Sequence, residues 1–207
     1  MTERGATASL PQPDPLPADL PRPIDDGSTR HVPGRAVPAL TLPATDGTDV
    51  TLDRVTAGRW VLFIYPSTHA PGAALPPGWN EIPGARGCSA EACGFRDNLA
   101  ALREAGAERV LALSADPTDY QQSLVQRFHL PYPLLSDPNL ALAAALRLPT
   151  FEADGRTLYK RLTMVVDGST ITHVFYPIFP PDRHATEVVA WLRTHPRVTP
   201  GLDASGA

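Results

Sequence analysis

Residues 60–65 read Trp60-Val61-Leu62-Phe63-Ile64-Tyr65, an unbroken apolar run that is typical of a β-strand covered on both faces. After a loop, residues 87–97 read Gly87-Cys88-Ser89-Ala90-Glu91-Ala92-Cys93-Gly94-Phe95-Arg96-Asp97, where a helix is expected to begin. The only two cysteines, Cys88 and Cys93, therefore lie where a loop gives way to a helix. The positive end of a helix dipole favours a thiolate, and a second thiol nearby can capture its oxidised form as a disulfide. Two cysteines can also be buried apolar fillers, but their placement after a buried strand favours redox chemistry.

The composition excludes several classes of protein. The chain has 207 residues, enough for one domain with a full core. Its net charge of −4 and the lack of a basic cluster argue against nucleic acid as a partner. No apolar stretch approaches the roughly 20 residues that span a bilayer, and the N-terminus lacks the pattern of a secretory signal. We therefore expect a cytoplasmic protein with no membrane partner.

Two cysteines in a reducing compartment indicate transient redox work or metal binding rather than a structural framework. Metal binding is the less favoured alternative, because Cys88 and Cys93 have no matching Cys/His pair at ligand spacing elsewhere. We expect no metal and no other cofactor.

The two ends of the chain differ in composition from the region between them. Residues 1–30 are rich in Pro, Ala, Asp and Thr without an apolar period, and they are predicted to form a disordered or extended arm. Residues 196–207 are predicted to be a flexible tail. A single domain is expected between them, over residues 31–195, and it contains no internal repeat.

Strands alternate with helices along this domain, and a hairpin and a closing helix follow. Asp116 is predicted to cap the helix that starts at Pro117. The order predicts an α/β, thioredoxin-like three-layer sandwich with a mixed central sheet flanked by helices. The expected strands are 39–42, 49–52, 60–65, 110–114, 162–166 and 170–175, and the expected helices are 89–105, 117–128, 137–146 and 182–193.

Several of these segments, taken together and in order, are similar to a known family. They are Tyr65-Pro66, residues 87–97, Ser114-Ala115-Asp116, residues 134–138 and residues 161–167. Over residues 32–194 the chain resembles the Q-type peroxiredoxins, the bacterioferritin-comigratory group, and residues 87–97 are the most specific part of the likeness.

The resemblance implies a thiol peroxidase in which Cys88 is the peroxidatic and Cys93 the resolving cysteine. It also implies that Arg161 lies beside the reactive thiol. From spacing alone, Arg161 could be a surface residue of the pair Lys160-Arg161, or a functional charge that opens a buried strand. The family match favours the second interpretation.

The chain departs from the family pattern at the threonine whose hydroxyl contacts the peroxide. An insertion, residues 73–87, precedes Cys88, and the threonine position falls on Ala70 or Ala85 depending on where the gap is placed. Thr68, Ser67 or Ser89 could supply the hydroxyl instead, and Thr68 is our candidate. The insertion is expected to be a surface loop anchored by Trp79, although a lid over the substrate is an alternative.

The leading hypothesis is a peroxidase that reduces hydrogen peroxide or organic hydroperoxides and is recycled by thioredoxin or a similar dithiol. A disulfide oxidoreductase is less favoured, because its usual Cys-x-x-Cys spacing is absent. The missing threonine motivates an alternative, a redox sensor or repurposed thioredoxin-fold protein with little turnover. A monomer or a weak homodimer is expected.

Overall fold

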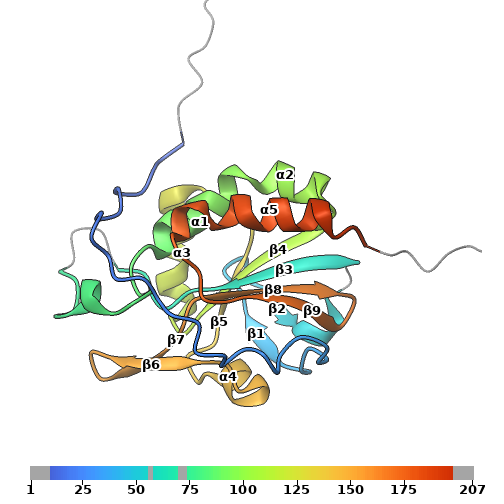
Figure 1. Cartoon of the computed structure of the whole chain (residues 1–207), viewed down its shortest axis with the longest axis horizontal. Helices are drawn as coiled ribbons and strands as arrows, with labels where there is room; N and C mark the ends of the chain where they lie inside the picture. The colour runs from blue at the N-terminus through green and yellow to red at the C-terminus, as the bar shows by residue number, and fades with distance from the viewer. Residues whose placement is uncertain (1–9, 56–57, 70–73, 198–207) are drawn as a thin grey trace, which may run out of the picture.

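The computed structural model describes residues 10–55, 58–69 and 74–197. Its centre is a five-stranded sheet with the order β5-β4-β3-β8-β9, in which β3 pairs parallel with β4 and antiparallel with β8 (Figure 1). In the antiparallel pair, Ile64 lies opposite Leu162. The strands are β3 (Arg59–Ile64), β4 (Arg109–Ser114), β5 (Leu134–Ser136), β8 (Leu162–Asp167) and β9 (Thr170–Phe175).

β3 divides the core because its side chains alternate between the two faces of the sheet. Trp60, Leu62 and Ile64 belong to one apolar cluster, and Val61 and Phe63 belong to another. All five are fully buried, so the continuous apolar run is the pattern of a strand covered on both sides.

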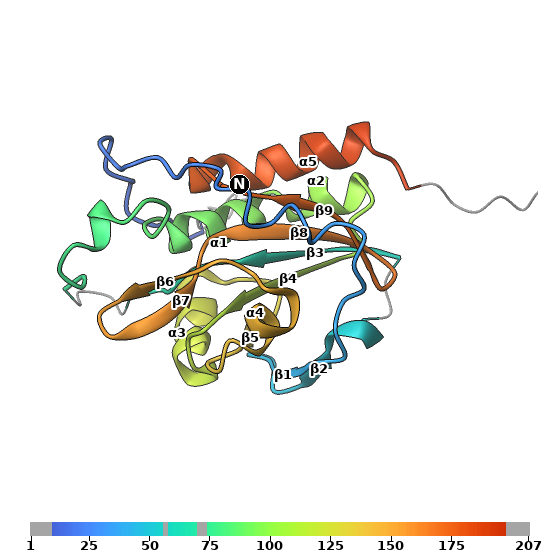
Figure 2. The same cartoon turned by 60° about the horizontal axis from the view of Figure 1, so that its bottom comes forward.

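Helices and hairpins cover the two faces. Figures 1 and 2 show α1, α2 and α5 over one face, and α3 adds Leu124 and Phe128 to the same apolar cluster. These helices are α1 (Cys88–Asp97), α2 (Leu99–Glu104), α3 (Thr118–Phe128) and α5 (His184–Thr194), the last preceded by the 3₁₀ turn η3 (Pro181–Arg183). The other face is covered by α4 (Ala141–Leu146), β1 (Thr41–Pro43), β2 (Asp49–Thr51), the turn η1 (Leu52–Arg54) and the hairpin β6 (Thr150–Ala153) and β7 (Arg156–Tyr159).

This arrangement confirms the predicted thioredoxin-like sandwich with a mixed sheet, and two details differ. The single helix expected over 89–105 is divided at Asn98, whose φ of −99° and ψ of 8° are not helical and whose side chain donates to the Gly94 carbonyl. The strand β5 and the β6–β7 hairpin had not been predicted, because they are short and lack a long apolar period.

The predicted cap at Asp116 is wrong. Pro117 occupies the N-cap position of α3 without a side-chain cap, and the Asp116 carboxylate is directed to other partners described below. The helix predicted over 137–146 begins later than expected, since α4 starts at Ala141 with Leu140 at its N-cap position. The two carboxylate oxygens of Asp137 nevertheless accept from the backbone N–H groups of Ala141 and Leu142 at 2.9 Å, which satisfies two donors of the first turn.

The Pro-rich arm contacts the domain at several points over the residues that the structure describes, 10–30. Asp26 accepts from Lys160 Nζ at 2.9 Å and from the Tyr176 hydroxyl at 3.1 Å, and Arg22 lies over the ring of Phe179. Prolines fix φ and lower the conformational entropy that docking costs, which explains why a segment of this composition can pack. Residues 1–9 and the predicted tail from 198 onward lie outside the described residues.

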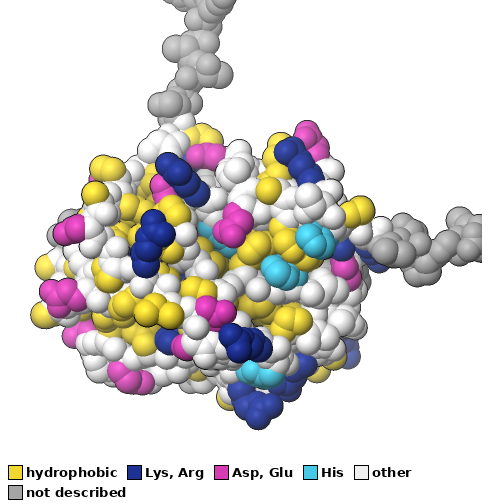
Figure 3. Space-filling view, viewed as in Figure 1, with side chains coloured by type: hydrophobic (Ala, Val, Ile, Leu, Met, Phe, Trp, Pro, Cys, Tyr) yellow, Lys and Arg dark blue, Asp and Glu magenta, His cyan; other side chains and the backbone are white. Residues whose placement is uncertain are grey.

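The surface view agrees with the modest net charge. Basic and acidic side chains are interspersed over the face shown in Figure 3, with apolar side chains between them. Within the described part of the chain, no helix combines the length and the apolar character that a membrane crossing needs.

Candidate functional site

The site is built where α1 begins. Cys88 is the first residue of α1, and Gly87 before it has a φ of 105°, a left-handed conformation that glycine adopts readily. A Cβ at Gly87 would also collide with Pro181 in η3. The sharp turn at Gly87 thus sets Cys88 at the helix N-terminus, with the residue 5% exposed.

Arg161 lies beside Cys88 and not on the surface. It is 3% exposed, and its Nη2 donates to Cys88 Sγ at 3.2 Å. The guanidinium also donates to the backbone carbonyls of residues 84–86 at 3.2–3.3 Å and forms a buried ion pair with Glu91. The neighbouring Lys160 is half-buried and pairs with Asp26 instead. A planar guanidinium held by this many acceptors has one orientation, and that orientation directs an N–H at the sulfur.

Glu91 is a site residue that the sequence analysis missed. Its side chain is fully buried, and its Oε2 pairs with Arg161, whereas its Oε1 has no hydrogen-bond partner among the residues that the structure describes. A signal was present, because Glu91 follows Cys88 by three residues and so lies on the same face of the helix. Burial raises the pKa of the Glu91 carboxyl, and Arg161 acts against that rise.

Opposing effects act on the Cys88 thiol. Burial raises the pKa of Cys88 above its ordinary value, and the negative Glu91 acts in the same direction. The charge and hydrogen bond of Arg161 lower the pKa, as does a backbone hydrogen bond from Ser67. The helix N-terminus adds a further stabilisation of the thiolate. The thiolate fraction at Cys88 thus depends above all on Arg161.

Cys93 is placed differently. It is 2% exposed, in the middle of α1, and burial raises the pKa of its thiol to about 11. The carbonyl of Ala92 beside it accepts a 2.6 Å hydrogen bond from the Tyr132 hydroxyl, which ties this part of α1 to the loop before β5. Both cysteines are free thiols. Cys88, at the helix start and next to a cation, is the better nucleophile of the two.

A cavity of about 290 Å³ opens above Cys88. Thr68, Trp79, Ala85 and Arg86 contribute to its wall, together with residues of the N-terminal arm. Trp79 is 3% exposed and packs on His69, with ring centroids 4.8 Å apart, so it anchors the insertion as expected. The wall brings together residues from the loop after β3, the insertion and α1.

Ala85, one of the two positions on which the family threonine could fall, lies three residues before Cys88 and lines the same cavity. Ala85 is fully buried, and its carbonyl accepts from Arg161 and lies 3.6 Å from Cys88 Sγ. Ala70, the other possibility, lies outside the described residues. Thr68 lines the Cys88 cavity, with its hydroxyl 3.4 Å from a carboxylate oxygen of Asp116.

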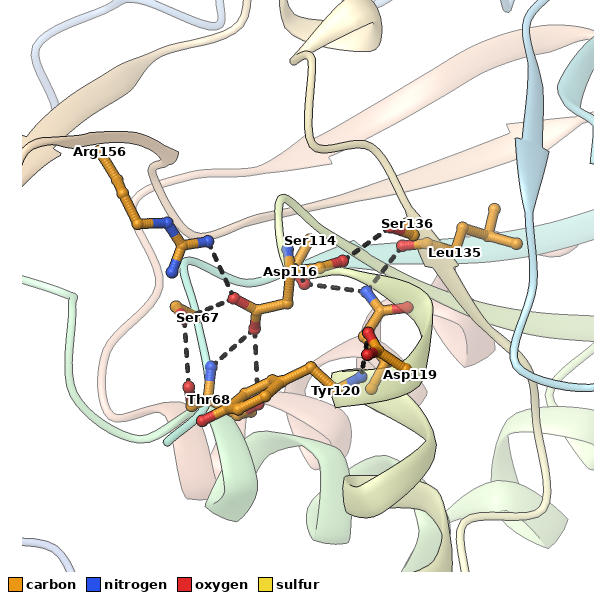
Figure 4. Close-up of polar contacts among 10 residues, drawn as sticks. Ser67, Thr68, Ser114, Asp116, Asp119, Tyr120, Leu135, Ser136 and Arg156 are labelled. Atoms are coloured by element: carbon orange, nitrogen blue, oxygen red, sulfur yellow. Dashed lines mark hydrogen bonds and ion pairs between the residues drawn. The ribbon is translucent and has the colours of Figure 1, made fainter. Parts of the chain in front are cut away.

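Asp116 holds the loop that follows β3, as Figure 4 shows. Its buried carboxylate lies 2.6 Å from the Ser67 hydroxyl and accepts from the Thr68 backbone N–H at 2.9 Å. Arg156 of β7 donates to the same carboxylate at 3.2 Å. Because Ser67 also supplies the backbone hydrogen bond to Cys88, Asp116 positions a donor at the reactive sulfur.

Replacing Asp116 by alanine should lower the free energy of unfolding by about 3 kcal/mol, because the buried Thr68 N–H and Ser67 hydroxyl lose their acceptor. It should also slow Cys88 alkylation by iodoacetamide about fivefold, since the Ser67 donor is no longer held. Denaturant unfolding and an alkylation time course measure the two effects.

The exposed Asp119 in the first turn of α3 provides the control, because Asp119→Ala should change the unfolding free energy by less than about 1 kcal/mol. Equal effects of the two substitutions would contradict a positioning role for Asp116.

No group of three His, Cys, Asp or Glu side chains among the described residues is arranged to hold a metal ion. The site brings together a thiol, a cation, a buried carboxylate and backbone donors around one cavity.

Comparisons with known proteins place this arrangement in a family. The family model described as Redoxin matches residues 32–190. The bcp peroxiredoxin of Coxiella burnetii is 30% identical over 162 residues, which are 77% of this chain and 97% of that protein. The chloroplastic peroxiredoxin Q of Suaeda salsa is 30% identical over 164 residues, covering 78% of this chain and 67% of that protein.

Among solved structures, peroxidoxin BcpB from Mycobacterium tuberculosis matches with a TM-score of 0.63 and 31% identity, over 80% of this chain and 99% of that one. The family model, the relatives that match over most of their length and the solved structure with the same fold all agree. The chain therefore belongs to the redoxin family, within the peroxiredoxins of the Q or bacterioferritin-comigratory group.

Proposed function

We propose that the chain is a thiol-dependent peroxidase, with its activity in the domain of residues 31–195. The observation that carries this is the Arg161 guanidinium, which is held by loop carbonyls and Glu91 with an N–H 3.2 Å from Cys88 Sγ. Hydrogen peroxide and organic hydroperoxides are the substrates, and thioredoxin or a similar dithiol is the reductant.

In the first step the Cys88 thiolate attacks the nearer oxygen of the peroxide, ROOH. A sulfur–oxygen bond forms and the O–O bond breaks, which gives the sulfenic acid Cys88–SOH and the alcohol or water ROH once a proton is taken up. Arg161 stabilises the thiolate before the attack and the charge on the departing oxygen during it. The Ser67 backbone donor, positioned by Asp116, and the hydroxyl of Thr68 lie at the same cavity.

In the second step the Cys93 thiol attacks the sulfenic sulfur, which forms the disulfide and releases water. A dithiol then reduces the disulfide and restores both thiols. Formation of the disulfide requires a change in the conformation of α1, because both cysteines lie in that helix five residues apart. Their Cα atoms are about 8–9 Å apart in helical geometry, beyond the roughly 7 Å that a disulfide spans.

Oxidation should therefore unwind the start of α1. We expect amide hydrogen exchange across residues 89–97 to become about tenfold faster when the wild-type chain is oxidised with one equivalent of peroxide. Exchange followed by mass spectrometry measures this. Cys93→Ser is the control, because it is oxidised at Cys88 without forming the disulfide and should keep its protection. A confirmed Cys88–Cys93 disulfide with unchanged exchange would refute the coupling.

The function itself is tested by peroxide consumption with thioredoxin, thioredoxin reductase and NADPH, beside a parallel assay with dithiothreitol. Turnover in both assays supports a thioredoxin-dependent peroxidase, and turnover with dithiothreitol alone indicates another dithiol. Stoichiometric oxidation of Cys88 without turnover in either assay would favour the redox sensor. That alternative has one observation behind it, since both positions on which the resemblance could place the family threonine, Ala70 and Ala85, lack a hydroxyl.

A reversible pair of thiols fits a reducing compartment, so we infer a cytoplasmic location. We also infer a monomer or a weak homodimer, since the cavity, the cation and both cysteines come from one chain. Sedimentation across a range of concentrations tests this inference.

A further inference from the structure

The N-terminal arm lies against the helix that carries both cysteines. In Figure 1 the arm follows the side of the molecule where α1 begins, and Figure 2 shows it beside the loop that leads into α1. The family model begins at residue 32, so the arm lies outside the matched region.

One contact of the arm is near the end of α1. The Pro11 carbonyl accepts a 2.7 Å hydrogen bond from Arg96 Nη1, and the same nitrogen donates to the Phe128 carbonyl at 2.8 Å. Arg96 is 6% exposed and is held in place by Asp97. A hydrogen bond from a buried charged donor is stronger than one between neutral groups, so this contact fixes the arm to α1 three residues beyond Cys93.

A second contact is at the start of α1. The Leu16 side chain lies against Gly87, where an added Cβ would be 3.4 Å from Leu16 Cδ2. Pro13, Asp14 and Leu16 also line the cavity above Cys88. The arm therefore touches the N-terminal turn of α1 through side chains and its C-terminal part through a carbonyl.

Two contacts farther along anchor the arm. Arg22 lies 5.1 Å from the centre of the Phe179 ring, and Asp26 pairs with Lys160 and Tyr176. Lys160 immediately precedes Arg161, so the contact of Asp26 anchors the arm next to the residue that holds the Cys88 thiol. With residues 20–30 fixed, residues 11–16 are held over α1.

We propose that residues 11–16 clamp α1 in its folded form and so control the fate of the Cys88 sulfenic acid. This proposal rests on the peroxidase function proposed above. The disulfide needs the start of α1 to unwind, which separates this turn from Leu16, while the Pro11 hydrogen bond holds the end of the helix in place. The clamp slows disulfide formation and keeps the sulfenic acid facing the cavity. There a second peroxide can convert it, with release of ROH, to the sulfinic acid Cys88–SO₂H.

Two variants and one control test the clamp. The first lacks residues 1–19 and keeps the anchored segment 20–30. The second, Leu16→Asp, puts a charge against Gly87 in the intact chain and covers the case in which the truncation does not fold. Leu10→Asp makes the same change at a residue that is 45% exposed and does not line the cavity.

The measurements are the rate of disulfide formation after one equivalent of hydrogen peroxide and the sulfinic fraction after a hundred equivalents, both by mass spectrometry of quenched samples. We expect about tenfold faster disulfide formation and a correspondingly smaller sulfinic fraction in the truncation and in Leu16→Asp. Leu10→Asp should match the wild type.

The outcomes separate the two proposals. If Cys88 is oxidised and the truncation and Leu16→Asp form the disulfide at the wild-type rate or more slowly, the clamp is wrong and the peroxidase function stands. An equal acceleration in Leu10→Asp would show a general effect of charge and also overturn the clamp. If the full-length chain forms no sulfenic acid at Cys88, the peroxidase function fails and the clamp fails with it.

Discussion

Replacing Cys88 by serine should reduce peroxide consumption to the background rate, a loss of at least about a thousandfold. A serine hydroxyl stays protonated at neutral pH and cannot accept the peroxide oxygen as a thiolate does. Cys93 cannot take over, because it is buried in the middle of α1 and its pKa is about 11. The NADPH-coupled assay measures the loss.

Cys93→Ser is the matched control for this prediction, since it removes the other thiol from the same helix. It should be oxidised at Cys88 in a single turnover, and a sulfenic-acid probe should label Cys88 alone. It should lose turnover with a dithiol that acts only on the disulfide. Peroxidase activity in Cys88→Ser would show that the roles of the two cysteines are assigned wrongly.

Replacing Arg161 by alanine should slow the oxidation of Cys88 by about 10². The loss has two parts. Burial raises the pKa of the Cys88 thiol, and Arg161 opposes that rise, so without the guanidinium the pKa rises further and less thiolate is present at neutral pH. The donor to the departing oxygen is lost as well. The pH at which oxidation is half-maximal should therefore move upward, which a stopped-flow series across pH can measure.

Two conservative substitutions make this test specific. Arg161→Lys keeps the charge but not the planar set of donors. Compared with Arg161→Ala, it should restore part of the lowering of the Cys88 pKa and a smaller part of the oxidation rate. Glu91→Gln keeps an acceptor for Arg161 and removes a negative charge that raises the pKa of Cys88, so its profile should move to lower pH. If Arg161→Ala leaves both the rate and the profile unchanged, Arg161 is not the cation of the site.

The sequence predicted the main layers because the strongest signals were long. The run from Trp60 to Tyr65 could only be a covered strand, and its alternation between two apolar clusters follows from strand geometry. The β6–β7 hairpin was missed because its strands have four residues each and are partly or fully exposed except at Leu158 and Tyr159, so they carry no apolar period.

The site was predictable in part. The spacing of residues could not decide whether Arg161 is a surface or a buried residue. The guanidinium is held by three backbone carbonyls, those of residues 84–86, and a backbone carbonyl leaves no signal in the sequence. Asp116 was interpreted from its position before Pro117 as a helix cap. Its actual partners, Ser67 and Thr68, lie almost fifty residues away and meet it only because β3 and β4 are neighbours in the sheet.

The pairing of Ile64 with Leu162 has a consequence for how this enzyme tolerates mutation. Arg161 directly precedes β8, and the loop that faces Cys88 directly follows β3. The hydrogen-bond register between the two strands therefore sets the position of Arg161 relative to that loop. A slip of one residue would turn every β8 side chain to the opposite face of the sheet. Insertions or deletions next to this strand pair can thus abolish the activity while every reactive residue is retained. Surveys of natural variants should weigh them as heavily as changes to the cysteines.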